Sequence, residues 1–140
     1  MALENKPIIV DTNIIFSALL RGQATFTKLL LTSEHRFFVC EQVLVELFKR
    51  KEKIVKASQL TEDDVIQLYS VLLRRINLFK EELISPENRL AAYRLCCDVD
   101  ETDTPHVALT LELSGLLWTG DRKLKDGLKS KGFDLFFELE

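Results

Sequence analysis

The chain of 140 residues carries 22 acidic and 19 basic residues, and 46% of its residues are hydrophobic, which is ordinary for a globular domain and excludes an intrinsically disordered chain. No apolar run approaches the roughly 18 residues that a membrane-spanning helix needs, and Met1–Lys6 shows no secretory signal, so we expect no membrane association. The formal net charge of −3 neither indicates nor excludes a nucleic-acid ligand, because local patches matter more than the sum.

The first half of the chain alternates short apolar runs with helical patterns. Continuous apolar residues predict a buried strand over residues 6–10, and Asp11 follows that strand directly. The elements predicted next are a helix over 14–20, a helix over 25–32, a strand over 36–40 and a helix over 41–53. This last helix carries an apolar stripe and a basic end, which suits a helix C-terminus.

The second half of the chain contains clear helix-start signals. Thr61 precedes three acidic residues, and Ser85 precedes Pro86, which is favoured at the first position of a helix. The predicted elements are helices over 61–75, 85–97, 104–113 and 122–130, and strands over 76–79, 116–119 and 133–137. Alternating strands and helices predict an α/β fold with a parallel sheet between helices. Because no linker or repeat divides the chain, we expect one domain over residues 1–140.

Four acidic residues stand at positions where side chains can converge. Asp11 follows the first predicted strand, and Asp121 follows the strand over 116–119. If those two strands are parallel neighbours, Asp11 and Asp121 lie together at the carboxyl edge of the sheet, where open α/β sheets place their sites. Asp103 opens a helix and Glu46 lies inside one. A carboxylate cluster of this kind suits Mg²⁺ or Mn²⁺, and two such ions can activate water and stabilise the leaving oxygen of a phosphodiester.

Each of these acids also has a structural interpretation when it is taken alone. Asp11 and Asp103 are both placed to cap the helices that follow them. Glu46 could face solvent, and Asp121 could belong to a Gly-Asp turn. Asp100 is a plausible extra ligand near Asp103, although it could also be a solvated loop residue.

Four segments favour the metal-binding interpretation over these structural ones when they are taken together. They occur in the order VDTNIIFSAL, VLVELFK, DTPHVALTLEL and LWTGDRKL. Together they resemble the PIN-domain family of Mg²⁺- or Mn²⁺-dependent nucleases over about residues 7–137. The resemblance implies a three-layer α/β/α fold whose parallel strands lie in the order 3-2-1-4-5. It also implies catalytic and metal-binding roles for the four acids and supporting roles for two polar neighbours: Asp11, Glu46, Asp103 and Asp121, with Asn13 and Thr119.

The same resemblance implies partners, because many small members of the family are toxins of type II toxin–antitoxin pairs that cut RNA and bind a small antitoxin. We therefore expect an RNA substrate, an antitoxin and a homodimer. Basic residues are candidates to bind the RNA backbone, although each could also belong to a solvated helix face: Lys49, Arg50, Arg122, Lys123 and Lys125. Apolar residues are candidates for an assembly surface, although each could equally pack in the core: Phe26, Leu29 and Leu30.

Other functions remain open from the sequence. The same nuclease chemistry could serve RNA processing or decay without an antitoxin, and a non-catalytic RNA-binding module is a further alternative. A phosphoaspartate receiver is disfavoured because no second acid follows Asp11 within Asp11-Thr12-Asn13. The three cysteines form no disulfide framework, which indicates reduced thiols in a cytoplasmic protein, and His35 and His106 stand alone, so no zinc site is predicted.

Overall fold

The computed structural model of the chain describes residues 6–21, 28–30, 34–58 and 60–138. In its first half the described elements are β1 (Ile8–Val10), α1 (Thr12–Arg21), β2 (Phe37–Cys40), α3 (Glu41–Lys49), α4 (Lys51–Ser58), α5 (Glu62–Arg75) and β3 (Ile76–Phe79). The second half adds η2 (Glu81–Leu83), α6 (Pro86–Cys96), η3 (Glu101–Asp103), α7 (Thr104–Glu112), β4 (Leu116–Trp118) and α8 (Arg122–Ser130), where η denotes a short 3₁₀ helix.

The described strands form a four-stranded, all-parallel sheet in the order β3-β2-β1-β4. Ile8 pairs with Leu116 and Val10 pairs with Trp118, so β1 and β4 are parallel neighbours, as the family resemblance implied. Their carboxyl ends meet at one edge of the sheet. The residue that follows β1, Asp11, therefore lies at the same edge as the residues that follow β4.

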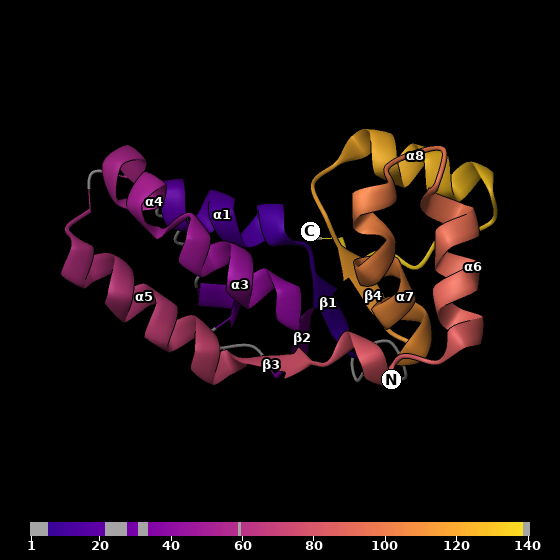
Figure 1. Cartoon of the computed structure of the whole chain (residues 1–140), viewed down its shortest axis with the longest axis horizontal. Coiled ribbons are helices and arrows are strands. Elements are labelled where there is room, and N and C mark those ends of the chain that lie inside the picture. Colours follow the sequence, from indigo (N-terminus) through magenta and orange to yellow (C-terminus); the bar gives the residue numbers. More distant parts are fainter. Residues whose placement is uncertain (1–5, 22–27, 31–33, 59, 139–140) are drawn as a thin grey trace.

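Both faces of the sheet are covered by helices. Side chains of a strand alternate between the faces, so Val10 and Trp118 pack with α1, α3, α4 and α5, whereas Ile9 and Leu117 pack with α6, α7 and α8. Figure 1 shows these two groups of helices on opposite sides of the strands. Burial on both faces explains why the strands are continuous apolar runs in the sequence. The predicted three-layer α/β/α architecture is confirmed.

Side-chain caps fix where two of the helices begin. The Thr61 hydroxyl accepts a hydrogen bond from the Asp64 N–H at 3.1 Å, and the Asp64 carboxylate accepts one from the Thr61 N–H at 3.4 Å, which makes a capping box for α5. The Ser85 hydroxyl accepts from the Asn88 N–H at 3.3 Å, and Pro86 follows at the first position of α6. Both predicted helix starts are confirmed because these local signals act without help from the rest of the fold.

The prediction of a single helix over 41–53 is wrong, because the chain forms two helices, α3 and α4, with a break at Arg50. Arg50 has φ −101° and ψ 7°, and its guanidinium lies 4.9 Å from the centre of the Phe16 ring. The change of direction lets α4 pack against α1 and buries Ile54. No glycine or proline stands at the break. Packing against α1, rather than a local sequence signal, therefore ends α3.

The fifth strand predicted over 133–137 is not formed among the described residues. The Phe133 N–H donates to the Leu128 carbonyl at 3.0 Å, so the start of this segment completes the end of α8 instead. One isolated parallel bridge then pairs Phe136 with Leu117 of β4. The segment thus lies where a fifth strand was expected, next to β4, but its backbone hydrogen bonds are shared between α8 and the sheet.

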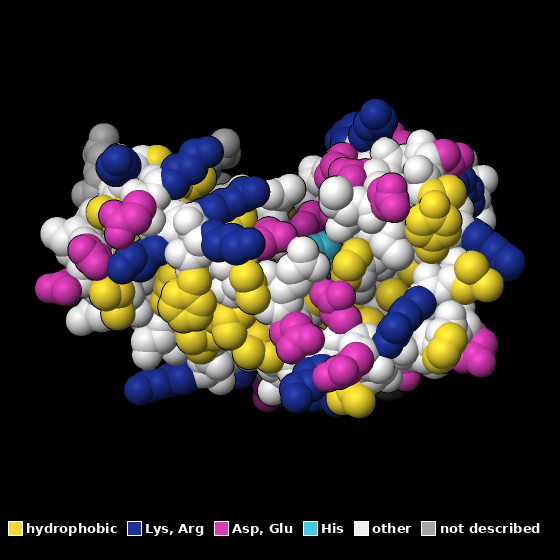
Figure 2. Space-filling view, in the orientation of Figure 1, with side chains coloured by type: hydrophobic (Ala, Val, Ile, Leu, Met, Phe, Trp, Pro, Cys, Tyr) yellow, Lys and Arg dark blue, Asp and Glu magenta, His cyan; other side chains and the backbone are white. Residues whose placement is uncertain are grey.

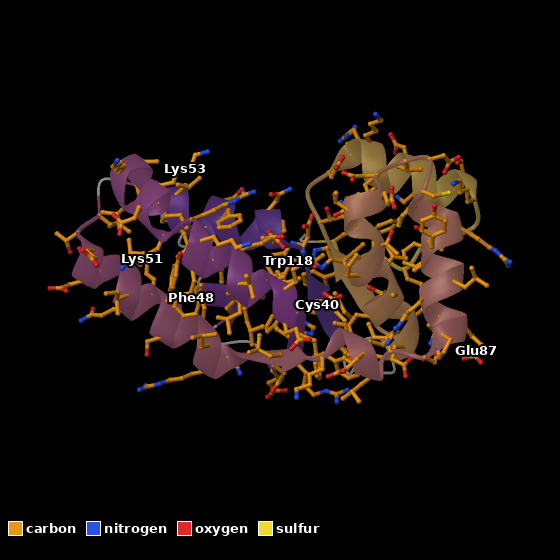
Figure 3. The ribbon with its side chains drawn as sticks, in the orientation of Figure 1. Cys40, Phe48, Lys51, Lys53, Glu87 and Trp118 are labelled. Atoms are coloured by element: carbon orange, nitrogen blue, oxygen red, sulfur yellow. The ribbon has the colours of Figure 1, made fainter. Side chains whose placement is uncertain are left out.

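Only residues 28–30 of the helix predicted over 25–32 lie within the described residues, and they are helical. Leu30 is buried in the core and Leu29 packs against it, whereas Phe26 lies outside the described residues. Exposed apolar side chains occur on α3, α5 and β3: Val45, Phe48, Ile66, Leu73 and Leu78. Figure 2 shows hydrophobic side chains gathered over α3 and α5, and Figure 3 shows Phe48 between these two helices. Across the part of the chain that is described, no helix has both the length and the apolar character needed to cross a bilayer.

Candidate metal centre

Asp11 is held at the carboxyl edge of the sheet by the strand next to it. Its N–H donates to the Trp118 carbonyl at 3.0 Å, which continues the β1–β4 ladder by one residue. Its carboxylate accepts a hydrogen bond from the Thr119 hydroxyl at 2.8 Å and a longer one from the Asn13 N–H at 3.3 Å. Asp11 is only 3% exposed, so these contacts fix a nearly buried carboxylate. The Asn13 side chain is exposed, and only its backbone contacts Asp11.

Asp103 ends η3 and lies at the start of α7, but its carboxylate makes no capping hydrogen bond there. The capping role considered from the sequence is therefore wrong, and the carboxylate is left to face its acidic neighbours. The pKa of Asp103 is raised to about 7, mainly by burial and further by the charges of Asp11, Asp100 and Asp121 and by a hydrogen bond to Asp100. Like charges and a 9% exposed position together make the ionised form costly.

His106 joins this site, although the sequence reasoning left it standing alone. It lies on α7 one turn beyond Asp103, a spacing that places both side chains on the same helix face. Its Nε2 lies 3.7 Å from Asp11 Oδ1 and 3.5 Å from Thr12 Oγ1. Burial lowers the pKa of His106, and the negative charges of Asp11 and Glu46 oppose that change. The helical spacing from Asp103 is the signal that could have found it.

Two groups of potential metal ligands share Asp103. We call Asp11, Asp103 and His106 the inner group, because all three are buried. We call Asp100, Asp103 and Asp121 the outer group, because Asp100 and Asp121 are partly exposed. Within each group the ligand atoms lie within 4.8 Å of one another. Figure 2 shows acidic side chains and a histidine in a hollow between the two groups of helices.

The two remaining members of the outer group are held by the ends of helices. Asp100 Oδ1 accepts hydrogen bonds from the Thr102 hydroxyl at 2.6 Å and the Thr102 N–H at 3.1 Å, and the bond with the hydroxyl is the main reason why the pKa of Asp100 is lowered. Asp121 Oδ1 accepts from the Leu124 N–H at 3.1 Å and so caps α8. Asp121 is therefore both a helix cap and a neighbour of Asp103.

Glu46 lies close to these groups but belongs to neither of them. It lines a cavity of about 270 Å³ whose wall also includes Thr12 and His106. Its negative charge, like that of Asp11, raises the pKa of His106 and so opposes the effect of burial. Glu46 is half-buried on α3, and the wall of the same cavity includes Pro105 and His106 from the start of α7. Glu46 is thus partly exposed and lies beside the site, and its role stays a prediction.

Comparison with known proteins identifies the fold. The sequence profile described as the PIN domain matches residues 9–136. The chain belongs to the PIN-domain family. Proteins of this family are generally nucleases, and the resemblance seen in the sequence is confirmed.

Two solved structures are similar to this PIN domain. One is VapBC2 from Rickettsia felis bound to a DNA fragment from the promoter of those proteins, with a TM-score of 0.61 and 17% identity over 86% of this chain and 92% of that one. The other is PAE2754 from Pyrobaculum aerophilum, with a TM-score of 0.61 and 14% identity over 90% of this chain and 81% of that one. No match was found among curated protein sequences. At these identities the two structures support the fold.

The donor atoms of this PIN domain fit a divalent cation. Carboxylate oxygens are the ligands that Mg²⁺ and Mn²⁺ prefer, and the shared Asp103 joins two ligand groups into one continuous site. Figure 3 labels Cys40 at the end of β2 and Trp118 at the end of β4, which mark the edge of the sheet where this site lies. Burial of Asp11 and His106 keeps bulk water away from the inner part of the site.

The basic residues predicted to bind a phosphate backbone lie in two places in this PIN domain. Lys49 and Arg50 are exposed at the end of α3, and Arg122 and Lys123 are exposed at the start of α8. Figure 2 shows lysine and arginine side chains on both sides of the hollow, over α1, α3 and α4 and over α8. Lys125 is less available, because its ammonium group donates to the Glu138 carboxylate at 3.0 and 3.1 Å.

Proposed function

We propose that this PIN domain is a metal-dependent endoribonuclease. The observation that supports this most directly is the convergence of Asp11, Asp103, Asp100 and Asp121 beyond the carboxyl ends of β1 and β4. Like charges are brought together at a cost in stability, which indicates that a bound cation normally compensates them. A pKa of about 7 for Asp103 is a measure of that cost.

The proposed ligands of Mg²⁺ or Mn²⁺ are Asp11, Asp103 and Asp121, with Glu46 and Asp100 at the margins of the site. When bound, such an ion supplies positive charge that stabilises the phosphodiester during hydrolysis and activates water for attack. The Thr119 hydroxyl fixes the direction of one Asp11 oxygen by its hydrogen bond. Near neutral pH, Asp103 holds a proton in part of the molecules, and it must release that proton when it binds a cation.

The backbone of the RNA is proposed to lie across the hollow. Lys49 and Arg50 on α3 and Arg122 and Lys123 on α8 would bind phosphates from its two sides. Such contacts position a strand without reading its sequence. Affinity for RNA should therefore fall with rising salt, as it does for ligands held by phosphate contacts.

A labelled single-stranded RNA tests the proposed activity. We expect cleavage in the presence of Mn²⁺ or Mg²⁺ and none in EDTA. Asp11→Asn serves as the control for a contaminating ribonuclease, because it removes one charge from the inner group. Asp98→Asn is the matched control, since Asp98 is an exposed acid that pairs with Lys131 instead of entering the site. Equal cleavage by the parent and by Asp11→Asn would indicate a contaminating ribonuclease. Cleavage by the parent that Asp11→Asn lacks, and that is undiminished in EDTA, would exclude the metal mechanism.

We further propose that the chain is the toxin of a toxin–antitoxin pair, with a small antitoxin as its partner. The similar fold of VapBC2 from Rickettsia felis supports this assignment over a role in RNA processing or decay. Induced expression of the chain should arrest growth, and expression of Asp11→Asn should not. Co-expression of a small protein encoded beside the chain should restore growth and yield a complex. Absence of growth arrest by an active ribonuclease would favour the RNA-processing role.

A homodimer is the expected assembly, and the cytoplasm is the expected compartment. The exposed apolar side chains on α3, α5 and β3 support self-association, because grouped apolar side chains often mark interaction surfaces. Phe48→Ser should therefore lower the molar mass measured by light scattering at tens of micromolar. Leu83→Ser is the matched control, since Leu83 is also exposed but lies on η2. A parent that is monomeric at this concentration would contradict the homodimer.

A further inference from the structure

The imidazole of His106 is buried without good hydrogen bonds. It is 8% exposed, and its Nδ1 has no partner among the described residues. Its Nε2 is 3.5 Å from Thr12 Oγ1 and 3.7 Å from Asp11 Oδ1, which is longer than the usual range of about 2.7–3.2 Å for such bonds. The nitrogen that faces Asp11 is therefore Nε2, whose hydrogen bond with Thr12 is long and weak, so this nitrogen is available to a stronger partner between the imidazole and the carboxylate.

The distance between the two groups fits a shared metal ion. Two ligand atoms that each lie about 2.1 Å from one ion are separated by at most about 4.2 Å. The separation of 3.7 Å between His106 Nε2 and Asp11 Oδ1 falls within this limit. Asp103 belongs to the same group of ligand atoms. Asp103 immediately precedes α7 and lies three residues before His106, so the start of the helix sets the spacing of these two ligands.

We propose that His106 Nε2 is a ligand of the metal ion held by Asp11 and Asp103, and that this nitrogen makes the inner group favour Mn²⁺ over Mg²⁺. The inference rests on the metal-dependent function proposed above. Both ions bind carboxylates well, but Mg²⁺ is the harder ion and gives up its waters reluctantly, so replacing one oxygen ligand by an imidazole nitrogen costs Mg²⁺ more affinity than it costs Mn²⁺. The outer group contains carboxylates alone and has no such preference.

Pulsed electron paramagnetic resonance of bound Mn²⁺ tests this coordination directly, because a coordinated imidazole adds a ¹⁴N modulation to the Mn²⁺ signal. The chain has two histidines, so the untagged parent can be compared with His106→Phe and His35→Phe. His35 is the matched control. Its Nδ1 is also buried without a partner among the described residues, but its ring packs against Phe37 and Phe137 and belongs to neither ligand group.

We expect imidazole modulation in the parent and in His35→Phe, and none in His106→Phe. Calorimetric titration should show that His106→Phe binds Mn²⁺ about tenfold more weakly or worse, the scale on which lost support of a metal site is usually felt, with a smaller loss for Mg²⁺. If His106→Phe does not fold, parent protein labelled with ¹⁵N-histidine gives the answer instead. In that sample the ¹⁴N pattern must be replaced by a ¹⁵N pattern.

The outcomes separate this inference from the proposed function. Mn²⁺ that binds the parent without imidazole modulation, or with modulation that persists in His106→Phe, overturns the role of His106 and leaves a carboxylate metal site intact. Equal losses of Mn²⁺ and Mg²⁺ affinity in His106→Phe overturn the preference for Mn²⁺. A parent that binds no Mn²⁺ in calorimetry overturns the metal-dependent function itself, and the role of His106 with it.

Discussion

The inner and outer groups share Asp103 but differ in how their other members are held. Asp100 and Asp121, in the outer group, each accept backbone hydrogen bonds at helix ends, so both carboxylates would be useful to the fold without any ligand. In the inner group, Asp11 accepts a short hydrogen bond from the Thr119 hydroxyl and a longer one from the Asn13 N–H at the start of α1, whereas the imidazole of His106 makes only long contacts. Burial is also greatest there. The inner group is therefore the part of the site whose arrangement the fold alone explains least.

This difference separates residues with two roles from residues with one. Removing the charge of an outer carboxylate leaves its helix cap largely intact if the replacement can still accept a hydrogen bond. Removing the charge of an inner carboxylate changes a buried site in which the His106 imidazole makes only long contacts. Activity should thus depend most on the inner group, whereas the pH dependence of stability should report on Asp103, which both groups contain.

The largest effect is expected for Asp11→Asn. Cleavage of RNA should fall at least about a hundredfold, the scale of losing a group that positions catalytic charge in a buried site. The Thr119 hydroxyl can still donate to the Asn side-chain oxygen, so the fold should survive. Initial rates of cleavage in saturating Mn²⁺ measure the effect, and circular dichroism checks the fold. A variant that keeps more than a tenth of the parent rate would place the reaction outside the inner group.

Asp103→Asn should change how stability depends on pH in the metal-free protein. The pKa of Asp103 is raised from 3.8 to about 7, so between these values the folded state binds a proton that the unfolded state does not. The free energy of unfolding therefore falls as pH rises through this window, and the full penalty is present above about pH 7. Asparagine carries no charge and can still donate a hydrogen bond to Asp100, so it removes this penalty.

Urea unfolding in EDTA at several pH values measures this change. Asp103→Asn should be more stable than the parent at about pH 8, and the advantage should shrink as pH falls towards about 5. Saturating Mn²⁺ should reverse the order, because a ligand that binds only the folded parent stabilises it by mass action. An advantage that stays constant with pH would show that Asp103 does not titrate in this window.

A smaller effect is expected for Asp100→Asn, which tests the outer group alone. The asparagine oxygen can keep the hydrogen bonds from Thr102, so the substitution removes charge without removing the turn. We expect about a tenfold loss of cleavage rate, which corresponds to roughly 1.4 kcal/mol in activation free energy. A loss as large as that of Asp11→Asn would mean that both groups contribute equally and that their difference in burial has no consequence for activity.

The sequence predicted the parts of this molecule that depend on local signals. Three such predictions are confirmed: the strand that stops just before Asp11, the cap at Thr61 and the helix from Arg122 to Ser130. They succeed because apolar runs, capping residues and terminal charges act over a few residues. The break at Arg50 could not be predicted in this way. It depends on the packing of α4 against α1, which no local pattern encodes.

The same limit applies to the site. Strand ends predicted that acids would meet at one edge of the sheet, and β1 and β4 do lie side by side. His106 was missed because a single histidine on an apolar helix usually belongs to the core, and its meeting with Asp11 requires α7 to pack against β1. The sequence also suggested a helix cap for Asp103 and a turn for Asp121, and the structure differs from both. Only Asp121 uses its side chain as a cap, which depends on the backbone turn that precedes each helix.

The smallest effect is expected for Asp121→Asn in the metal-free protein. The substitution removes a negative charge near Asp103, which relieves repulsion, but it also removes a charge that favours the positive end of α8, worth about 0.3–1 kcal/mol. Asparagine caps helices about as well as aspartate does, so the hydrogen bond from the Leu124 N–H should persist. We therefore expect a small rise in the melting temperature, with a change in the free energy of unfolding below about 1 kcal/mol.

Asp121→Ala is the matched variant, because it removes the same charge and the cap as well. It should be destabilised by about 1 kcal/mol relative to Asp121→Asn, the usual cost of losing a cap of this kind. Thermal shifts with and without millimolar Mn²⁺ then separate the two roles of Asp121. If Asp121 is a metal ligand, Mn²⁺ raises the melting temperature of the parent more than that of either variant, since the variants bind the ion less tightly. If all three proteins respond equally to Mn²⁺ and Asp121→Asn melts below the parent, Asp121 serves α8 alone and the ion is held by the inner group without it.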